Sequence, residues 1–544
     1  MSLVLGSEID FELTSKRLKD DITDDWFRDP FDFDDFLDDL THLERIAGKR
    51  ISTSKAISSL LFDIPKKKFI LRYSVETFIV DRILYQAIID KLVVDFDRAI
   101  RSDVYNHRHR TADKTKLFKK GVEAWNDFQT AVTSDLKARP DGCLLVTDLA
   151  NYYENISLDD LKSQMLYMVD RMSIPHIKNI EYKKLIFTLH KLLNKWSHFK
   201  GRSIPQNRDA SSFLGNIYMS SIDNTIGPKY RYYRYMDDIR IVCDSEVEAR
   251  QALADLIREL RKFGLSVNSA KTHFISDASK IELKNEFLST FDNDTTLVEH
   301  LISKRTLTAY TDAAVFIIRK VSELTASQNI GERKFRFYIN RLNSLVNTEV
   351  IGEIISARSD FQSLLTDVIA EVGNQPWAID EVVKLLRHSP LQVTHLDAIE
   401  NMLLMNSKYE WVSYHLWMLL VAKDIKTDNL IREAKRIINQ DDCSSPEVAG
   451  ALVYIGKFAP DDVKWSIVDN FRRYKYFLAQ RHALIAIHDL KFDRDRFMTI
   501  KKHINQNLDS SYGILNKKFS GKYCKEYPLH SLATPIQDTL TVSS

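Results

Sequence analysis

Three aspartates stand at positions where carboxylates could hold divalent metal ions. Asp148 ends the apolar run CLLVT, and Asp237 and Asp238 follow Met236 between two strand-like runs in YRYMDDIRIVC. We expect Asp148 at the edge of a buried sheet, with the Leu149 carbonyl beside it, and the paired aspartates in a hairpin turn. Like charges in one turn repel each other unless a cation or water screens them. The side chains therefore predict a site for two divalent ions, which phosphoryl transfer from a nucleoside triphosphate requires.

The spacing of the aspartates alone leaves an ordinary alternative open, because an Asp-Asp pair is usually a solvated turn. The neighbouring segments argue against that alternative. In chain order the sequence carries DLANYYENI, SIPQNRDASSFLGNIYM, YMDD and GLSVNSAKT. Chance does not plausibly deliver this four-part ordered series, so metal-ion chemistry is the better interpretation.

The elements that must position these motifs alternate between strand and helix patterns. Residues 141–275 contain the strand-like runs CLLVT, YRYYRY, IRIVC and THFI, separated by helical patterns such as EVEARQALADLIRELRKFG. This alternation predicts a mixed α and β domain. Upstream, residues 66–100 predict a lysine cluster and a long amphipathic helix. From about residue 300 onward nearly every window has a helical period with short breaks, which predicts stacked helical hairpins.

The motifs resemble the palm of reverse transcriptases, with DLANYYENI as motif A, SIPQNRDASSFLGNIYM as motif B, YMDD as motif C and GLSVNSAKT as motif D. The segment FILRYSVETFIVDRILYQAI is similar to the fingers of bacterial and group II intron enzymes. The resemblance covers residues 66–280, about two fifths of the chain. It implies an α+β fingers and palm that use two Mg²⁺ ions, with Mn²⁺ as the alternative ion.

The resemblance also implies roles for individual residues. Asp148 and Asp237 would bind both metal ions, and Asp238 would complete the catalytic site less directly. Tyr153 stands where an aromatic side chain blocks a ribose 2′-hydroxyl, which implies deoxynucleotide substrates.

Three further positions match residues that contact the incoming nucleotide. Gln206 of motif B would line the nucleotide, Lys271 of motif D would lie near the pyrophosphate, and Arg72 of the fingers would contact the triphosphate. Ordinary surface or packing roles remain the alternative for these three residues.

Motif B departs from the pattern of templated enzymes. These usually read PQG, where the glycine lets the backbone approach the nascent base pair closely. Asn207 takes that place here, and Ser203 stands where another glycine is usual. We therefore expect altered packing on a template.

No compact thumb, maturase domain or HNH domain follows motif D in the sequence, and a helical half takes their place. A palm with altered motif B joined to a helical half resembles the abortive-infection reverse transcriptases of bacteria. The similarity is to the AbiK and AbiA type, and especially to their shorter prophage-borne relatives. That resemblance implies untemplated DNA synthesis, priming from a protein hydroxyl so that DNA becomes covalently attached, homo-oligomers, and defence against phage.

We expect three regions: an N-terminal segment and fingers at 1–140, a palm at 141–285, and an all-α helical-repeat domain, a HEAT-like solenoid, at 286–544. The acidic and aromatic stretch DDWFRDPFDFDDFLDDL is interpreted as a solvated helical face with aromatic anchors. The segment YNHRHR is interpreted as a phosphate contact or plain surface, with a metal site at its H-x-H as the weakest alternative.

Composition sets broader limits. The 544 residues include 77 Lys and Arg against 75 Asp and Glu, so any attraction to phosphate must come from local patches. The four cysteines form no C-x-x-C pair, which disfavours a zinc site or a disulfide framework and fits a reducing cytoplasm. The resemblance implies that this cytoplasm is bacterial. The acidic N-terminus does not resemble a signal peptide, and no apolar run is long enough to span a bilayer, so we expect no membrane partner.

The leading hypothesis is a phage-defence enzyme that polymerises deoxynucleotides without a template and carries single-stranded DNA as its product. The alternative within the same chemistry is a templated reverse transcriptase of retron or intron type that uses a structured RNA. A third hypothesis is a binding scaffold with a vestigial palm. The priming hydroxyl stays open among Tyr73, Tyr85 and Tyr105 in the fingers, many serines, and three tyrosines near the C-terminus. Those three are Tyr512, Tyr523 and Tyr527.

Overall fold

The computed structural model describes residues 2–4, 7–53, 59–276, 293–404, 409–441, 443, 445–491, 493–504, 508 and 511–525. The chain divides into two compact units. The first unit comprises residues 1–28, 32–62 and 74–289. The second, which we call the helical unit, comprises residues 29–31, 63–73 and 290–544.

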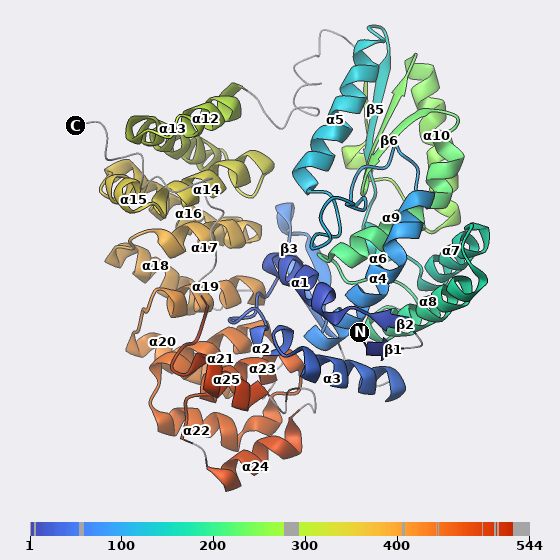
Figure 1. Cartoon of the computed structure of the whole chain (residues 1–544). Coiled ribbons are helices and arrows are strands. Elements are labelled where there is room, and N and C mark those ends of the chain that lie inside the picture. The colour runs from blue at the N-terminus through green and yellow to red at the C-terminus, as the bar shows by residue number, and fades with distance from the viewer. Residues whose placement is uncertain are drawn as a thin grey trace. The chain divides into compact units, whose positions relative to one another are not determined.

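A four-stranded antiparallel sheet is the framework of the first unit (Figure 1). Its order is β6-β7-β5-β8. The strands are β5 (Cys143–Asp148), β6 (Arg231–Tyr235), β7 (Asp238–Cys243) and β8 (His273–Ile275). Each coincides, to within one residue, with a run that the sequence predicts as a strand, so the prediction of a mixed α and β region is confirmed.

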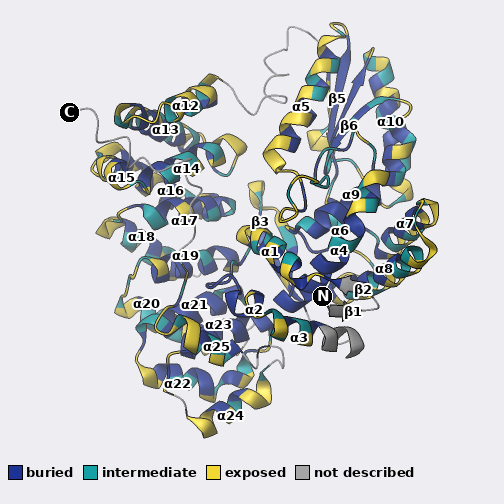
Figure 2. Ribbon diagram, viewed as in Figure 1, coloured by how far each residue is buried: buried dark blue, intermediate teal, exposed yellow. Residues whose placement is uncertain are grey.

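Helices cover both faces of this sheet. α10 (Glu246–Lys262) packs on β5 and β7, and α5 (Gly121–Lys137) packs on β6 and β7. Trp125 and Phe128 of α5 join Leu144 of β5 in one hydrophobic cluster. With both faces covered, every residue of β5 is buried, as Figure 2 shows.

The segment predicted to combine a lysine cluster with a long amphipathic helix contains a strand followed by a long helix. β4 (Leu71–Glu76) pairs with β3 (Leu60–Pro65), and α4 spans Ile79–Ala99. The amphipathic prediction is wrong for residues 79–89 of α4, which are all buried, and α1 (Phe11–Asp21) and α8 (His176–Trp196) are among the helices that pack on α4. A stretch of helix that is enclosed by neighbours has no solvent-facing side that requires polar residues, whereas the last turns of α4 expose Val94 and Arg98.

Shorter elements complete the first unit. The remaining strands and helices are β1 (Ser2–Val4), β2 (Ser7–Ile9), α2 (Asp34–Leu37), α3 (Leu40–Thr53), α6 (Tyr152–Asn155), α7 (Leu158–Arg171) and α9 (Asp209–Ile226).

The helical unit confirms the prediction of an all-helical C-terminal region. Its α-helices are α12 (Asn293–Ser303), α13 (Leu307–Ala326), α14 (Arg333–Val346), α15 (Glu349–Ser356), α16 (Ser359–Asn374), α17 (Ile379–His388), α18 (Val393–Leu404), α19 (Glu410–Ala422), α20 (Asp428–Ile438), α21 (Pro446–Phe458), α22 (Asp461–Asp469), α23 (Phe477–Ile487), α24 (Arg494–His503) and α25 (Ser511–Phe519). Helices α14, α17, α19, α21 and α23 pack one on the next. Their apolar side chains therefore form a continuous core along this row.

Much of the acidic and aromatic N-terminal stretch is buried, so its interpretation as a solvated face is wrong. Asp25 forms ion pairs with Arg82 and Arg208, all within the first unit. Asp29 belongs to the helical unit, where it forms a buried ion pair with Arg481 at 2.9 Å. Burial by itself raises a carboxyl pKa, but the Arg481 charge holds the pKa of Asp29 below its usual range. Buried arginines at distant positions therefore explain Asp25 and Asp29, and the local sequence could not reveal these partners.

The cysteines are all free thiols, and three of the four are buried. In the part of the chain that the structure describes, no helix combines the length and the apolar character needed to cross a membrane.

Candidate active site

The three predicted aspartates lie at one end of the paired strands β5 and β7. Asp148 is the last residue of β5 and lies directly opposite Asp238, the first residue of β7. Asp237 lies in the turn between β6 and β7, and the Leu149 amide donates to its backbone carbonyl at 3.2 Å. The sheet thus brings together two motifs that are far apart in the sequence.

The aspartates are electrostatically coupled. Burial raises the pKa of Asp237 to about 6, and the negative charges of Asp148 and Asp238 add to the shift. Lys271 Nζ donates to Oδ2 of Asp148 at 2.8 Å. Burial alone would lower the pKa of Lys271, but this hydrogen bond and the nearby carboxylates hold that pKa above its ordinary value. The site therefore concentrates negative charge that a cation stabilises.

The donor set fits a hard divalent cation such as Mg²⁺, which prefers carboxylate and carbonyl oxygens. The raised pKa of Asp237 is the observation that tests this fit, because a divalent cation relieves repulsion between carboxylates. Among the described residues, no three acidic, histidine or cysteine side chains form a preformed metal cluster. Asp148 and Asp237 would hold the ion together with the Leu149 carbonyl, beside Asp238.

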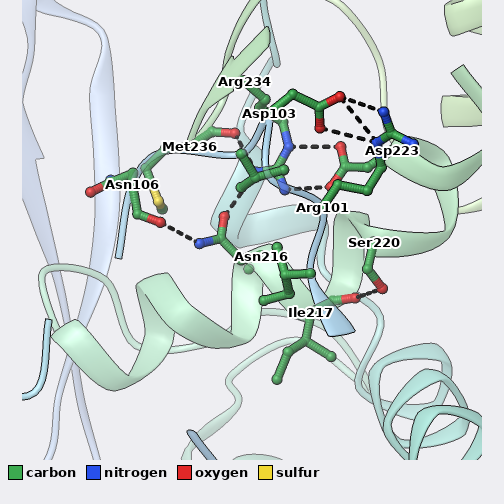
Figure 3. Close-up of polar contacts among 12 residues, drawn as sticks. Arg101, Asp103, Asn106, Asn216, Ile217, Ser220, Asp223, Arg234 and Met236 are labelled. Carbon is green, nitrogen blue, oxygen red and sulfur yellow. Dashed lines mark hydrogen bonds and ion pairs between the residues drawn. The ribbon is translucent and has the colours of Figure 1, made fainter. Parts of the chain in front are cut away.

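A buried arginine fixes the turn that carries the paired aspartates. Met236 has a left-handed backbone conformation, with φ at 56°. Arg234 donates from Nη1 to the Met236 carbonyl and to Oδ1 of Asn216, both at 2.9 Å (Figure 3). Its Nη2 lies 2.6 Å from Asp223, and both side chains of this ion pair are fully buried. The buried ion pair between Arg234 and Asp223 therefore holds the turn in place through the hydrogen bond to the Met236 carbonyl.

Sequence reasoning did not single out Arg234, Asn216 and Asp223. Asn216 donates to the Asn106 carbonyl at 2.6 Å, and Tyr232 donates to Asp223 at 2.8 Å. The strand RYYRY could have indicated a buried charge, because Tyr232 and Arg234 alternate with less buried residues and so share the inward face of the strand. A charged residue at an inward position of a strand requires a buried partner.

Motifs A and B are in direct contact. Tyr153 lies on α6, and its hydroxyl is 3.0 Å from Oγ of Ser212 on α9. The Tyr153 carbonyl accepts a hydrogen bond from the Ile204 amide at 3.3 Å. Gln206 follows two residues later in the same loop and is buried. The structure thus places the loop that carries Gln206 beside Tyr153.

The two positions of motif B that usually hold glycine keep a left-handed backbone. The φ angles are 80° at Ser203 and 57° at Asn207. Asparagine tolerates this conformation better than most residues, whereas serine is strained in it. The Asn207 side chain also donates to the backbone carbonyl of Asp24. The glycine-like backbone is therefore retained, but a side chain tied to the N-terminal segment occupies the place of a hydrogen atom.

Residues 64–327 match the family model for reverse transcriptase (RNA-dependent DNA polymerase). The chain contains a reverse transcriptase domain. This protein is therefore an enzyme, a nucleotidyltransferase of the RNA-directed DNA polymerase type. The match includes every predicted site residue, from Arg72 to Lys271. No curated protein matches the chain.

The motif B loop of the reverse transcriptase domain is anchored by a buried ionic network. Arg208 pairs with Asp25 and with Glu76, each at 2.8 Å. Arg82 pairs with the same Asp25 and, at 2.8 Å, with Asp21. Asp21 in turn accepts a hydrogen bond from the amide that begins α9. The N-terminal segment is thus part of the support for motif B, which the local sequence did not indicate.

Arg72 is not grouped with the aspartates in the first unit. It lies on β4, is half-buried, and belongs to the piece of chain, residues 63–73, that clusters with the helical unit. Its contact with the triphosphate stays a prediction.

The basic segment YNHRHR has a structural role in the reverse transcriptase domain. Arg108 donates to Asp97 at 2.7 Å and to the carbonyls of Arg101 and Val104, near the end of α4. His107 contacts Asp209 at 2.9 Å. The phosphate-contact interpretation is therefore wrong for Arg108, because its guanidinium donates hydrogen bonds to protein groups at the end of α4.

Proposed function

We propose that this reverse transcriptase polymerises deoxynucleotides without a template and serves in bacterial defence against phage. The observation that carries the proposal is the contrast between the metal-binding part of the predicted site and motif B. Asp148, Asp237 and Asp238 are all present, whereas Asn207 carries a side chain where templated enzymes have glycine. The Asn207 side chain donates a hydrogen bond to the Asp24 carbonyl. The side chain and the N-terminal segment would therefore take up space where close packing on a base pair needs a residue without a side chain.

In this proposal Asp148 and Asp237 hold two Mg²⁺ ions, or Mn²⁺ in their place, and Asp238 completes the site. Bound divalent ions would lower the pKa of the attacking hydroxyl and neutralise the leaving pyrophosphate. Lys271 is next to Asp148 and so is suited to contact the pyrophosphate. Its amino group could then supply positive charge as the leaving group departs.

The nucleotide would be held by residues of motifs A and B and of the fingers. Tyr153 would exclude a ribose 2′-hydroxyl, and its bond to Ser212 keeps the ring in one orientation. Gln206 and Arg72 would contact the nucleotide and its triphosphate. The chemical class of substrate is therefore the deoxynucleoside triphosphate.

We further propose that synthesis starts on a protein hydroxyl. The hydroxyl oxygen would bond to the α-phosphorus, the bond to the β-phosphate would break, and pyrophosphate would leave while the hydroxyl proton passes to solvent. Tyr85 and Tyr523 are poor candidates because both are buried and burial raises the pKa of each. Tyr105 and Tyr512 are half-buried, and burial raises the pKa of Tyr512 to about 12.

Packing does not rule out the other two tyrosines as the priming residue. Tyr73 is half-buried, and Tyr527 lies outside the described residues. Mass spectrometry of a nucleotide-modified peptide would identify the residue among these tyrosines and the serines.

The helical unit would act as a HEAT-like scaffold in a homo-oligomer. Support comes from the row α14, α17, α19, α21 and α23, in which each helix packs on the next. Such stacking is typical of solenoids, whose repeats contact only their neighbours.

The experiment supplies purified, nuclease-treated protein with Mg²⁺ and dNTPs alone. The proposal expects long DNA that remains bound to protein after denaturation. If DNA forms only when a primer and template are added, the enzyme is a templated reverse transcriptase of retron or intron type. If Asp237→Ala leaves phage defence intact, the palm is vestigial and the chain acts as a scaffold.

A further inference from the structure

The last part of the helical unit carries a strong local positive charge. Residues 471–525 contain 13 Lys and Arg against four Asp and Glu. The whole chain is nearly balanced, with 77 basic and 75 acidic residues, so the remainder of the chain is net negative. The surplus lies on η6 (Phe471–Arg473), α24, α25 and the turns beside them.

Most of these cations are exposed. Six of them define what we call the C-terminal basic surface: Lys475, Lys491, Lys501, Lys502, Lys517 and Lys522, all exposed. Within the described part of the chain, none of the six forms an ion pair.

Some exposed cations on other helices of the same unit have acidic partners. Arg436 pairs with Glu433 at 2.5 Å, and Lys384 pairs with Asp380 at 2.8 Å. Charge that is left uncompensated on one part of a surface is the usual electrostatic footprint of a polyanion site.

Aromatic rings are interleaved with this charge. Trp465 lies 5.9 Å from Phe497, and Phe497 lies 4.5 Å from Tyr512, measured between ring centroids. The Arg496 guanidinium lies over the Trp465 ring at 4.8 Å. Trp465 and Tyr512 are half-exposed, so each presents part of its ring to solvent. The contacts also show that α22, α24 and α25 lie together.

We propose that the C-terminal basic surface binds single-stranded nucleic acid, with Trp465 and Tyr512 as stacking platforms. Proteins that hold single strands without sequence preference combine a basic track for phosphates with aromatic rings for bases. The strand it would take is the single-stranded DNA product, so this inference rests on the proposed function.

The test is oligonucleotide binding by the full-length chain. Nuclease-treated protein carrying Asp237→Asn, which prevents synthesis, is titrated into fluorescein-labelled oligothymidylate, and anisotropy is followed over a range of salt concentrations. The test variant adds Lys501→Gln, Lys502→Gln and Lys517→Gln. The matched control adds Lys304→Gln, Lys426→Gln and Arg432→Gln, which remove three exposed charges from other helices and turns of the same unit.

We expect the test variant to bind about tenfold more weakly or worse near 0.1 M salt, and the slope of log K against log salt to fall by about 2. The control should match the parent protein. Equal binding by all three proteins overturns the inference, as does binding of vesicles containing phosphatidylserine in place of the oligonucleotide.

The experiments can refute the proposed function and the single-strand binding independently of each other. Untemplated synthesis is assayed with Asp237 intact, so its absence beside normal oligonucleotide binding refutes the proposed function alone. Unchanged binding by the test variant refutes this inference alone.

Discussion

Arg234 donates a hydrogen bond to the backbone carbonyl of Met236, 2.9 Å away, and so supports the turn that presents Asp237. The same guanidinium is paired with Asp223 where neither side chain reaches solvent. The position of a predicted metal ligand thus depends on a buried ion pair whose two residues are not themselves predicted metal ligands.

Substituting Arg234 should therefore reduce DNA synthesis by displacing the turn that carries Asp237. Arg234→Lys keeps the charge but loses the planar fork that reaches Asp223, Asn216 and Met236 together. We expect at least a tenfold loss of DNA synthesis and a loss of up to about 3–5 kcal/mol in unfolding free energy, the range for breaking a buried pair. Nucleotide incorporation and urea unfolding measure the two effects.

Arg231→Lys is the control for this change, because Arg231 begins the same strand but is partly exposed and pairs with Asp244. It should leave both quantities nearly unchanged. An Arg234→Lys enzyme as active as the parent would refute the positioning role.

Removing one carboxylate should abolish synthesis while stabilising the metal-free protein. Asp237→Asn deletes a charge that burial and two neighbouring aspartates disfavour. Synthesis should fall below detection, and the melting temperature without Mg²⁺ should rise by a few degrees. Asp244→Asn, at an exposed position beyond β7, is the matched control. Retained synthesis by Asp237→Asn would exclude the proposed catalytic site.

Restoring glycine in motif B should shift the enzyme toward templates. Asn207→Gly keeps the left-handed backbone at φ 57° and removes the side chain that bonds Asp24. We expect untemplated synthesis to fall and synthesis on an added primer and template to rise, as measured by product yield in parallel reactions.

Asn207→Ala is the companion variant. It also removes the amide, but it leaves a side chain in a strained conformation, at a cost of about 1 kcal/mol. It should lose stability without gaining template use. Equal template use by the glycine and alanine variants would show that backbone access is not the limiting feature.

Tyr153 should determine the choice of sugar. Tyr153→Ala opens the space beside the predicted 2′ position, so ribonucleotides should be incorporated at least tenfold more readily relative to deoxynucleotides. Tyr153→Phe keeps the ring and loses only the hydroxyl that meets Ser212, so it should retain deoxynucleotide selectivity. Unchanged selectivity in the alanine variant would remove Tyr153 from the nucleotide site.

The stability of the helical unit should fall in acid because of His482. Burial lowers the pKa of His482 from 6.5 to about 4, and the neutral ring contacts the Leu478 carbonyl and the Tyr414 hydroxyl. The unfolded chain binds a proton near pH 6.5 and the folded chain only near pH 4. Stability is therefore fully present above pH 6.5 and declines by about 3 kcal/mol as the pH falls to 4.

Urea unfolding between pH 4 and 8 measures this contribution. His482→Gln should flatten the profile, whereas His503→Gln, at an exposed position on α24, should not. A profile that is the same in the parent and in His482→Gln would show that other groups control acid stability.

The sequence by itself determined the strands that end in Asp148 and flank Asp237, the order of the motifs, and the helical second half. These follow from local hydrophobic periods and from residue types at fixed spacing, which a linear chain displays directly. Motif B also identified Ser203 and Asn207 as unusual, because their neighbours mark where glycine belongs.

Only the tertiary structure decided the roles of the buried charges. Asp25 and Asp29 seemed solvated because their arginine partners, Arg208 and Arg481, lie far along the chain. The sequence did not reveal the Arg234 contact with the turn that carries Asp237 and Asp238, for the same reason. A buried charge is stable only beside its partner, and which partner the fold brings near is a property of the three-dimensional arrangement that no local pattern records.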